Sequence, residues 1–283
     1  MTSNPFVALR RVADDSPSRT GRDMLRTSAA FLFAALASSI HAQTDDRVVD
    51  IPTRSGVVQR VLVLSPADPK AALILFAGGH GGLQISSSGS FKWGARNFLV
   101  RSRQLFTEQG FRVIVVDAPS DRQTAPFLAG FRQKPEHVVD VGAVITWARQ
   151  HAKIPVWLIG TSRGTQSAAF VTTELAAVQG PDGLVLTSTV LSDDKGRAVP
   201  AMALDKLRIP VLVVHHEYDG CRLCSFREIP ALMNKLSEAP RKQLLSFTGG
   251  EDRGDPCEAA GYHGFNGIER EVVVQIAQWI LAK

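Results

Sequence analysis

The segment with the clearest chemical potential in this sequence is a serine flanked by glycines. Ser162 lies in Gly160-Thr161-Ser162-Arg163-Gly164, which has the form G-x-S-x-G and stands between an apolar run and an amphipathic segment. A nucleophilic serine at a tight strand-to-helix turn needs small neighbours, because the backbone there is strained and the hydroxyl must project above the sheet. The alternative is an ordinary glycine-flanked helix cap. We expect Ser162 to be an acyl-transfer nucleophile.

A serine hydroxyl is a poor nucleophile at neutral pH, so it needs a base and a carboxylate that orients the base. Asp219 follows the apolar run that begins at Val211, and His263 lies in a glycine-rich loop before the last predicted helix. Taken singly, Asp219 could be a turn residue and His263 a loop or capping residue. The chain order Ser162, Asp219, His263 is the order that a hydrolase triad on an α/β sheet requires. Glu217 is the competing acid.

These residues resemble the motifs of the α/β-hydrolase superfamily, in particular its small exported bacterial serine hydrolases of the esterase and dienelactone-hydrolase type. The resemblance covers about residues 45–283, and its specific parts are Gly160–Gly164, Asp219 and the Gly-Tyr-His-Gly segment at 261–264. It implies that Ser162 is the nucleophile, His263 the general base and Asp219 the residue that orients the histidine. The family places its acid at the turn after the strand, which favours Asp219 over Glu217.

The same resemblance implies an oxyanion hole made of backbone amides. One donor is the amide of the residue after the nucleophile, here Arg163. The second is expected in the glycine-rich segment 76–82, at Gly79 or His80. This segment departs from the H-G-G-G pattern, because its histidine falls between two glycine pairs. The Arg163 side chain could bind an anionic group of the substrate, but we expect it to pair with a nearby acid.

The elements that must position these residues are visible as an alternation of two kinds of segment. An antiparallel pair is predicted around the turn at Arg54-Ser55-Gly56, from Val48–Pro52 and Val57–Leu64. Further strands, expected to be buried on both faces, are Ala72–Ala77, Arg112–Asp117, Val156–Gly160, Gly183–Thr187, Val211–His215 and Leu244–Phe247. Apolar spacings of three and four predict helices at Asn97–Gln109, Glu136–His151, Thr165–Val178, Ser225–Leu236 and Ile268–Leu281.

This pattern is typical of an α/β fold with a mostly parallel, twisted sheet that helices cover on both faces. Because no linker divides residues 43–283, we expect one domain there. The segment between Thr187 and Pro210 is too short for a large helical lid. The loop between Leu83 and Arg96 carries Phe91 and Trp93, which either shape the substrate pocket or dock on the surface.

Residues 1–42 have the pattern of a secretory signal, with arginines before the apolar stretch 29–36 and small residues up to Ala42. Met24 could be the true start, and a buried N-terminal helix is the alternative reading. We therefore expect a periplasmic or secreted protein without a stable membrane span. A net charge of +5 without a basic block argues against nucleic-acid binding.

Three cysteines, Cys221, Cys224 and Cys257, flank the expected acid and base. If Asp219 and His263 are in contact, their loops are adjacent, so we expect a Cys221–Cys257 disulfide that leaves Cys224 as a free thiol. A Cys221–Cys224 redox pair and a zinc site are the alternatives.

The function expected from these observations is a cofactor-independent serine hydrolase, without a metal, that cleaves an ester, thioester or amide of a small or medium substrate. Carboxylesterase chemistry is favoured, and an exopeptidase or amidase on the same triad is the first alternative. The second is a binding protein that keeps the fold without turnover. No motif for binding a dinucleotide or hydrolysing a nucleotide is present. The oligomeric state stays open.

Overall fold

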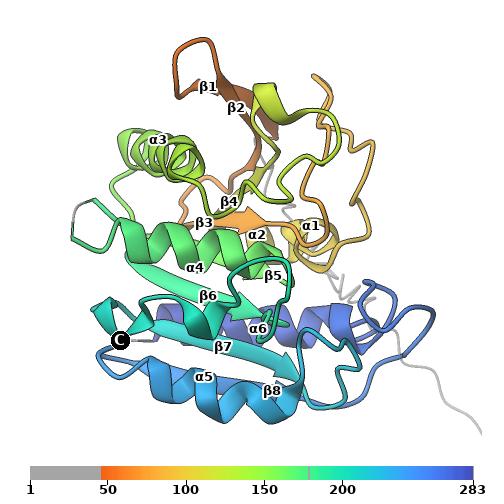
Figure 1. Ribbon diagram of the computed structural model, residues 1–283. Helices are drawn as coiled ribbons and strands as arrows, with labels where there is room; N and C mark the ends of the chain where they lie inside the picture. The colour runs from red at the N-terminus through yellow and green to blue at the C-terminus, as the bar shows by residue number, and fades with distance from the viewer. Residues whose placement is uncertain (1–45, 178, 283) are drawn as a thin grey trace, which may run out of the picture. The chain divides into compact units, whose positions relative to one another are not determined.

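The computed structural model describes residues 46–177 and 179–282, which fall in one compact unit. The leader expected at residues 1–42 lies outside the described residues. The described chain contains an eight-stranded sheet with strand order β1-β2-β4-β3-β5-β6-β7-β8 (Figure 1). Its strands are β1 (Arg47–Pro52), β2 (Val58–Leu64), β3 (Ala71–Phe76), β4 (Phe111–Val116), β5 (Val156–Thr161), β6 (Gly183–Thr187), β7 (Val211–His216) and β8 (Lys242–Phe247).

Six of these strands run parallel, as expected from the sequence. β1 and β2 form the predicted antiparallel pair, β2 is also antiparallel to β4, and all the other pairs are parallel. Every residue of β3, β5, β6 and β7 is buried, which is why these segments read as continuous apolar runs. The carboxyl ends of β5, β6 and β7 therefore meet at one edge of the sheet.

Helices cover both faces of the sheet (Figure 1). On one face α3 (Pro135–His151), α4 (Gly164–Glu174) and α5 (Ile229–Lys235) pack on one apolar core. On the other, α1 (Phe98–Arg101), α2 (Arg103–Glu108) and α6 (Glu269–Leu281) pack on a second. The connections carry the 3-10 turns η1 (Ser120–Arg122), η2 (Val199–Ala201), η3 (Leu204–Lys206), η4 (Phe226–Glu228) and η5 (Tyr262–Gly264). None of the described helices is long and apolar enough to cross a membrane.

Three expectations about single elements were wrong. The helix expected over 97–109 is two short helices, because the backbone at Ser102 leaves the α conformation. The helix that begins at Gly164 ends at Glu174, because the chain turns there. β8 is not buried on both faces: it is an edge strand that pairs only with β7, and only Phe247 in it is buried.

A disulfide joins the loop after β7 to the loop before η5. The bond links Cys221, which is buried, to Cys257, which is exposed, across a sequence separation of 36 residues. This is the pairing expected from the sequence. Cys224 is a free and fully buried thiol.

Loss of this disulfide should destabilise the protein. Cys257→Ser should lower the free energy of unfolding by about 3–4 kcal/mol, because the unfolded chain regains the entropy of a loop of about 36 residues. Urea unfolding with and without a reductant measures the difference, and Cys224→Ala is the matched control that leaves the bond intact. Non-reducing peptide mapping must give the Cys221–Cys257 peptide. A major Cys221–Cys224 peptide, or three free thiols, would contradict the assignment.

A second prediction comes from His137, in the first turn of α3. Its ring is fully buried between Phe76 and Phe131, and neither ring nitrogen has a partner within the described residues. Burial, together with the charges of Arg132 and Arg54, lowers the His137 pKa to about 3. Between the unfolded and folded pKa values the unfolded chain binds the extra proton, so stability must fall as the pH falls.

We expect His137→Leu to reduce this loss of stability by up to about 1.4 kcal/mol for each pH unit between about pH 6 and pH 4. Urea unfolding across that range measures it. Val139→Leu, at an exposed position of the same helix, is the control, because it removes no titratable group and should leave the pH dependence unchanged. Identical profiles for the parent and His137→Leu would show that His137 is not held neutral by the fold.

Candidate active site

Ser162 stands at a sharp turn between β5 and α4. Its φ is 52°, in the left-handed region that non-glycine residues rarely adopt. A side chain at Gly160 would collide with the Gly164 backbone, and one at Gly164 would collide with the Phe76 carbonyl. The Ser162 carbonyl accepts bonds from the Thr165 amide at 2.9 Å and the Thr165 hydroxyl at 2.6 Å. The glycines thus leave room for a strained turn that helix α4 then holds in place.

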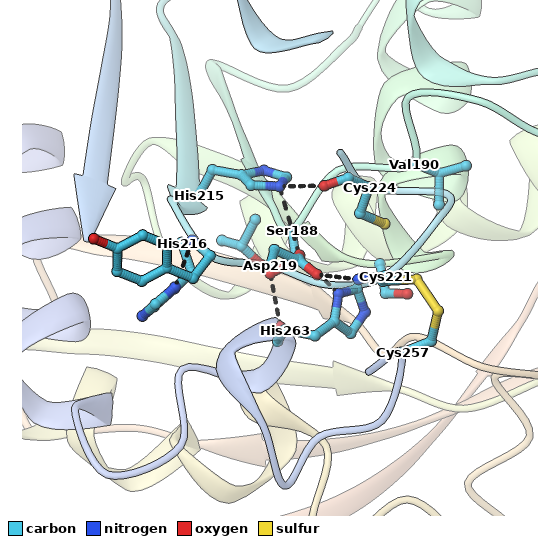
Figure 2. Close-up of polar contacts among 12 residues, drawn as sticks. Ser188, Val190, His215, His216, Asp219, Cys221, Cys224, Cys257 and His263 are labelled. Carbon is cyan, nitrogen blue, oxygen red and sulfur yellow. Dashed lines mark hydrogen bonds and ion pairs between the residues drawn. A yellow bond between two sulfur atoms is a disulfide. The ribbon is translucent and has the colours of Figure 1, made fainter. Parts of the chain in front are cut away.

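Asp219 and His263 are in direct contact at the same edge of the sheet (Figure 2). His263 Nδ1 lies 2.9 Å from Asp219 Oδ2, and Asp219 Oδ1 accepts the amide of Cys221 at 2.9 Å. Both side chains are almost completely buried. A hydrogen bond from Nδ1 to the carboxylate places the proton on that nitrogen and leaves a lone pair on Nε2. The Asp219 carboxylate therefore fixes the orientation of the His263 ring.

The histidine loop is held by contacts that the sequence did not reveal. The Ser188 hydroxyl, just after β6, donates to the His263 carbonyl at 2.7 Å (Figure 2). Arg101 on α1 donates to the carbonyls of Ala259 and Gly264 at 3.0 and 2.7 Å. These bonds join residues far apart in the sequence, and no spacing or periodicity could have indicated them.

Ser162 and His263 are linked through the end of β6. The Ser162 amide donates to the Thr187 carbonyl at 3.1 Å, and the next residue, Ser188, holds the His263 backbone. No hydrogen bond joins the Ser162 hydroxyl to the histidine: His263 Nε2 is buried and has no partner in the described part of the chain. The structure thus pairs the expected acid with the expected base and leaves the contact between base and serine unformed.

Glu217, the competing acid, is exposed and accepts a hydrogen bond from Ser246 at 2.8 Å. A second histidine, His215, also lies near the Asp219 carboxylate: its Nε2 is 3.5 Å from Oδ2 and 2.7 Å from the Cys224 carbonyl oxygen. Burial lowers the His215 pKa. His215 thus packs beside the carboxylate with its Nε2 on the Cys224 carbonyl, and it lies farther from Oδ2 than the His263 ring does.

The glycine-rich segment after β3 lies against the serine. A Cβ built on Gly78 would be 3.0 Å from Ser162 Cβ. Gly79 has a φ of 56°, and a Cβ there would collide with the Trp93 ring. The His80 ring lies between Trp93 and Phe127, with ring centroids 3.8 and 4.4 Å away. The Gly82 amide donates to its Nδ1. His80 is therefore a packed, hydrogen-bonded ring in a segment that begins, at Gly78, against Ser162.

The Arg163 side chain forms the expected structural bridge: its NH1 lies 2.8 Å from Asp193 Oδ2. Arg163 follows Ser162 directly and is the N-cap residue of α4.

Asp193 belongs to the segment between β6 and β7, which holds only the turns η2 and η3, so no helical lid is formed there. Trp93 packs against the second core and against His80, which makes its loop part of the wall around the glycine segment.

One cluster has ligand types that suit a soft metal. Cys221, Cys224 and a ring nitrogen of His263 lie within 4.8 Å of one another. The sulfur of Cys221 is bonded to Cys257, so it cannot ligate as a thiolate. Burial, followed by the charge of Asp219, raises the pKa of the Cys224 thiol well above its usual value. The cluster is therefore a disulfide beside a protonated thiol.

No protein-family model and no curated protein matches this sequence. Solved structures do resemble it. An esterase from Pyrococcus furiosus is 12% identical with a TM-score of 0.58, covering 84% of this chain and 92% of its own. A dienelactone hydrolase from Anabaena variabilis is 12% identical with a TM-score of 0.56, covering 84% and 95%. A serine hydrolase without a lid from Xanthomonas campestris is 16% identical with a TM-score of 0.53, covering 85% and 98%.

At these identities the likeness concerns the fold. The sheet order, the helices on both faces and the strand-to-helix turn at Ser162 agree with it. The described chain has the α/β-hydrolase fold.

Proposed function

We propose that this protein is a serine hydrolase that cleaves an ester of a small or medium substrate through an acyl-enzyme. The observation that carries the proposal is the buried contact between Asp219 and His263 at 2.9 Å, at the sheet edge where Ser162 occupies its strained turn. A buried carboxylate that orients a histidine is what a serine nucleophile needs. The esterase and dienelactone hydrolase names among the similar structures support the choice of an ester.

The reaction follows from the roles of the three side chains. His263 Nε2 takes the proton of the Ser162 hydroxyl as Oγ attacks the carbonyl carbon of the substrate. The negative charge that develops on the carbonyl oxygen is stabilised by backbone amides, those of Arg163 and of Gly79 or His80. The tetrahedral intermediate collapses, and the leaving alcohol takes the proton from His263. Water, deprotonated by His263, then hydrolyses the acyl-enzyme and restores the serine.

For this step Ser162 Oγ and His263 Nε2 must come within about 2.6–3.2 Å of each other, and catalytic hydrogen bonds of this kind often tighten only when the substrate is bound. The Ser162 side chain is partly accessible, and the His263 Nε2 atom has no competing partner in the described part of the chain. We expect the contact between Ser162 Oγ and His263 Nε2 to form when the substrate binds.

We further propose that the protein is exported. The arginine-rich and then apolar pattern of residues 1–42 and the Cys221–Cys257 disulfide both support an oxidising compartment. The periplasm or the outside of the cell is such a compartment, and the substrate would be met there.

Ser162 should be the single site of covalent labelling. We expect a fluorophosphonate probe to modify Ser162, and Ser162→Ala to lose both labelling and about 10⁶ of the turnover on a nitrophenyl ester while keeping the fold. Mass spectrometry locates the label, and circular dichroism checks the fold. Ser192→Ala, on the nearby β6–β7 segment, is the matched control. Full activity of Ser162→Ala would falsify the mechanism, and a parent that is folded but neither labelled nor active would indicate a binding protein instead.

The two acids should differ sharply. Asp219→Asn should lower kcat by about 10⁴, because the amide can no longer hold the histidine in the required tautomer. Glu217→Gln should leave kcat close to that of the parent, because Glu217 contacts Ser246 and not His263. Steady-state kinetics on the same ester measures both. The reverse ranking would transfer the role to Glu217.

A further inference from the structure

Arg132 is a buried cation without a carboxylate partner. Its side chain is only 5% exposed, and among residues 46–177 and 179–282 no acid forms an ion pair with it. Burial, with a smaller effect of Arg163, lowers the Arg132 pKa to about 9, so the side chain stays charged at neutral pH. Burying an unpaired charge lowers the stability of the folded protein, so the hydrogen bonds that the guanidinium makes are the guide to its role.

The Arg132 guanidinium binds the backbone of the glycine-rich segment beside Ser162. Its NH2 donates to the Ala77 carbonyl at 3.0 Å and to the Gly79 carbonyl at 3.2 Å, and its NH1 donates to the Ser167 hydroxyl on α4 at 2.8 Å. The guanidinium therefore ties together the segment after β3 and the helix that follows the nucleophile, which are the two expected sources of oxyanion donors.

The chain around Arg132 adds a further contact and a steric match. The Leu128 amide donates to the His80 carbonyl at 3.0 Å, so one segment, 128–132, holds three carbonyls of the glycine-rich segment. Gly81 has a φ of 74°, and a side chain there would collide with the Arg132 guanidinium. The shape of the glycine segment thus accommodates the arginine.

These bonds fix the direction of two amides. The carbonyl and the N–H of a trans peptide unit point to opposite sides. Because the Ala77 and Gly79 carbonyls face Arg132, the amides of Gly78 and His80 face away from it, and the Gly78 backbone lies against Ser162. The cation also draws electron density toward the carbonyl oxygens, which makes the paired amides better donors.

We propose that Arg132 is a positioning residue that orients and polarises the backbone amides of Gly78 and His80 toward the reacting carbonyl at Ser162. This inference rests on the proposed function. It also favours His80 over Gly79 as a donor, since the peptide unit that carries the Gly79 amide is not held by Arg132.

Replacement of Arg132 should therefore affect the transition state more than substrate binding. We expect Arg132→Met to lower kcat on a soluble nitrophenyl ester by about 10²–10³, as loss of an oxyanion donor does, with KM changed by less than about threefold. The affinity for a trifluoromethyl ketone, which forms a tetrahedral adduct with the serine, should fall by the same factor as kcat. Arg132→Lys keeps the charge but loses the fork, and should lower kcat by about tenfold.

The matched control is Arg103→Met on α2, which removes a partly buried arginine that also donates to a backbone carbonyl, that of Val100. All rates are divided by the concentration of serine that a fluorophosphonate labels, so loss of folded protein does not count as loss of kcat. A purely structural role would leave kcat per labelled site and the ketone affinity unchanged.

Two failures are distinguishable. If the parent is not labelled at Ser162, the proposed function is wrong. If the parent is labelled and active but Arg132→Met keeps kcat within about threefold, Arg132 does not orient the donors and the inference is overturned. If Arg132→Met does not fold, Arg132→Lys decides by the same criterion: a kcat equal to the parent's overturns the inference, and a tenfold loss at constant KM supports it.

Discussion

The contact between Asp219 and His263 depends on bringing two loops, 44 residues apart in sequence, to one edge of the sheet with both side chains buried. A buried carboxylate is tolerated only where hydrogen bonds replace its water, and here the Cys221 amide and the histidine ring supply them. The disulfide ties the same two loops together. The bonds from Ser188 and Arg101 hold the backbone of the histidine loop at three carbonyls.

The same edge of the sheet concentrates strain and buried charge that the rest of the fold must support. Ser162 has a positive φ between two glycines that no larger residue could replace, and Arg132 is buried without an acidic partner among the residues that the structure describes. Both features cost stability, and both lie within the segments that would surround a reacting carbonyl. The two apolar cores, one on each face of the sheet, provide the stability that lets these unfavourable arrangements persist.

The sequence predicted the strands, their direction and the meeting of Asp219 with His263, because apolar runs report buried parallel strands and because loops after such strands share one edge. It did not predict the exposure of β8, since the apolar pair Leu244 and Leu245 does not reveal which strand is at the edge. It also missed Arg101, Arg132 and Ser188. The backbone carbonyls of the site that they bind lie 53 to 163 residues away, and no local pattern encodes such contacts.

If Ser162, Asp219 and His263 form one catalytic centre, a crystal structure of the protein after reaction with a phosphonate ester will show it. We predict phosphorus bonded to Ser162 Oγ, with one phosphoryl oxygen about 2.7–3.1 Å from the amides of Arg163 and His80. His263 Nε2 should lie within hydrogen-bond distance of the adduct and Nδ1 should still contact Asp219. An adduct on another residue, or a phosphoryl oxygen without backbone donors and remote from His263, would contradict the account.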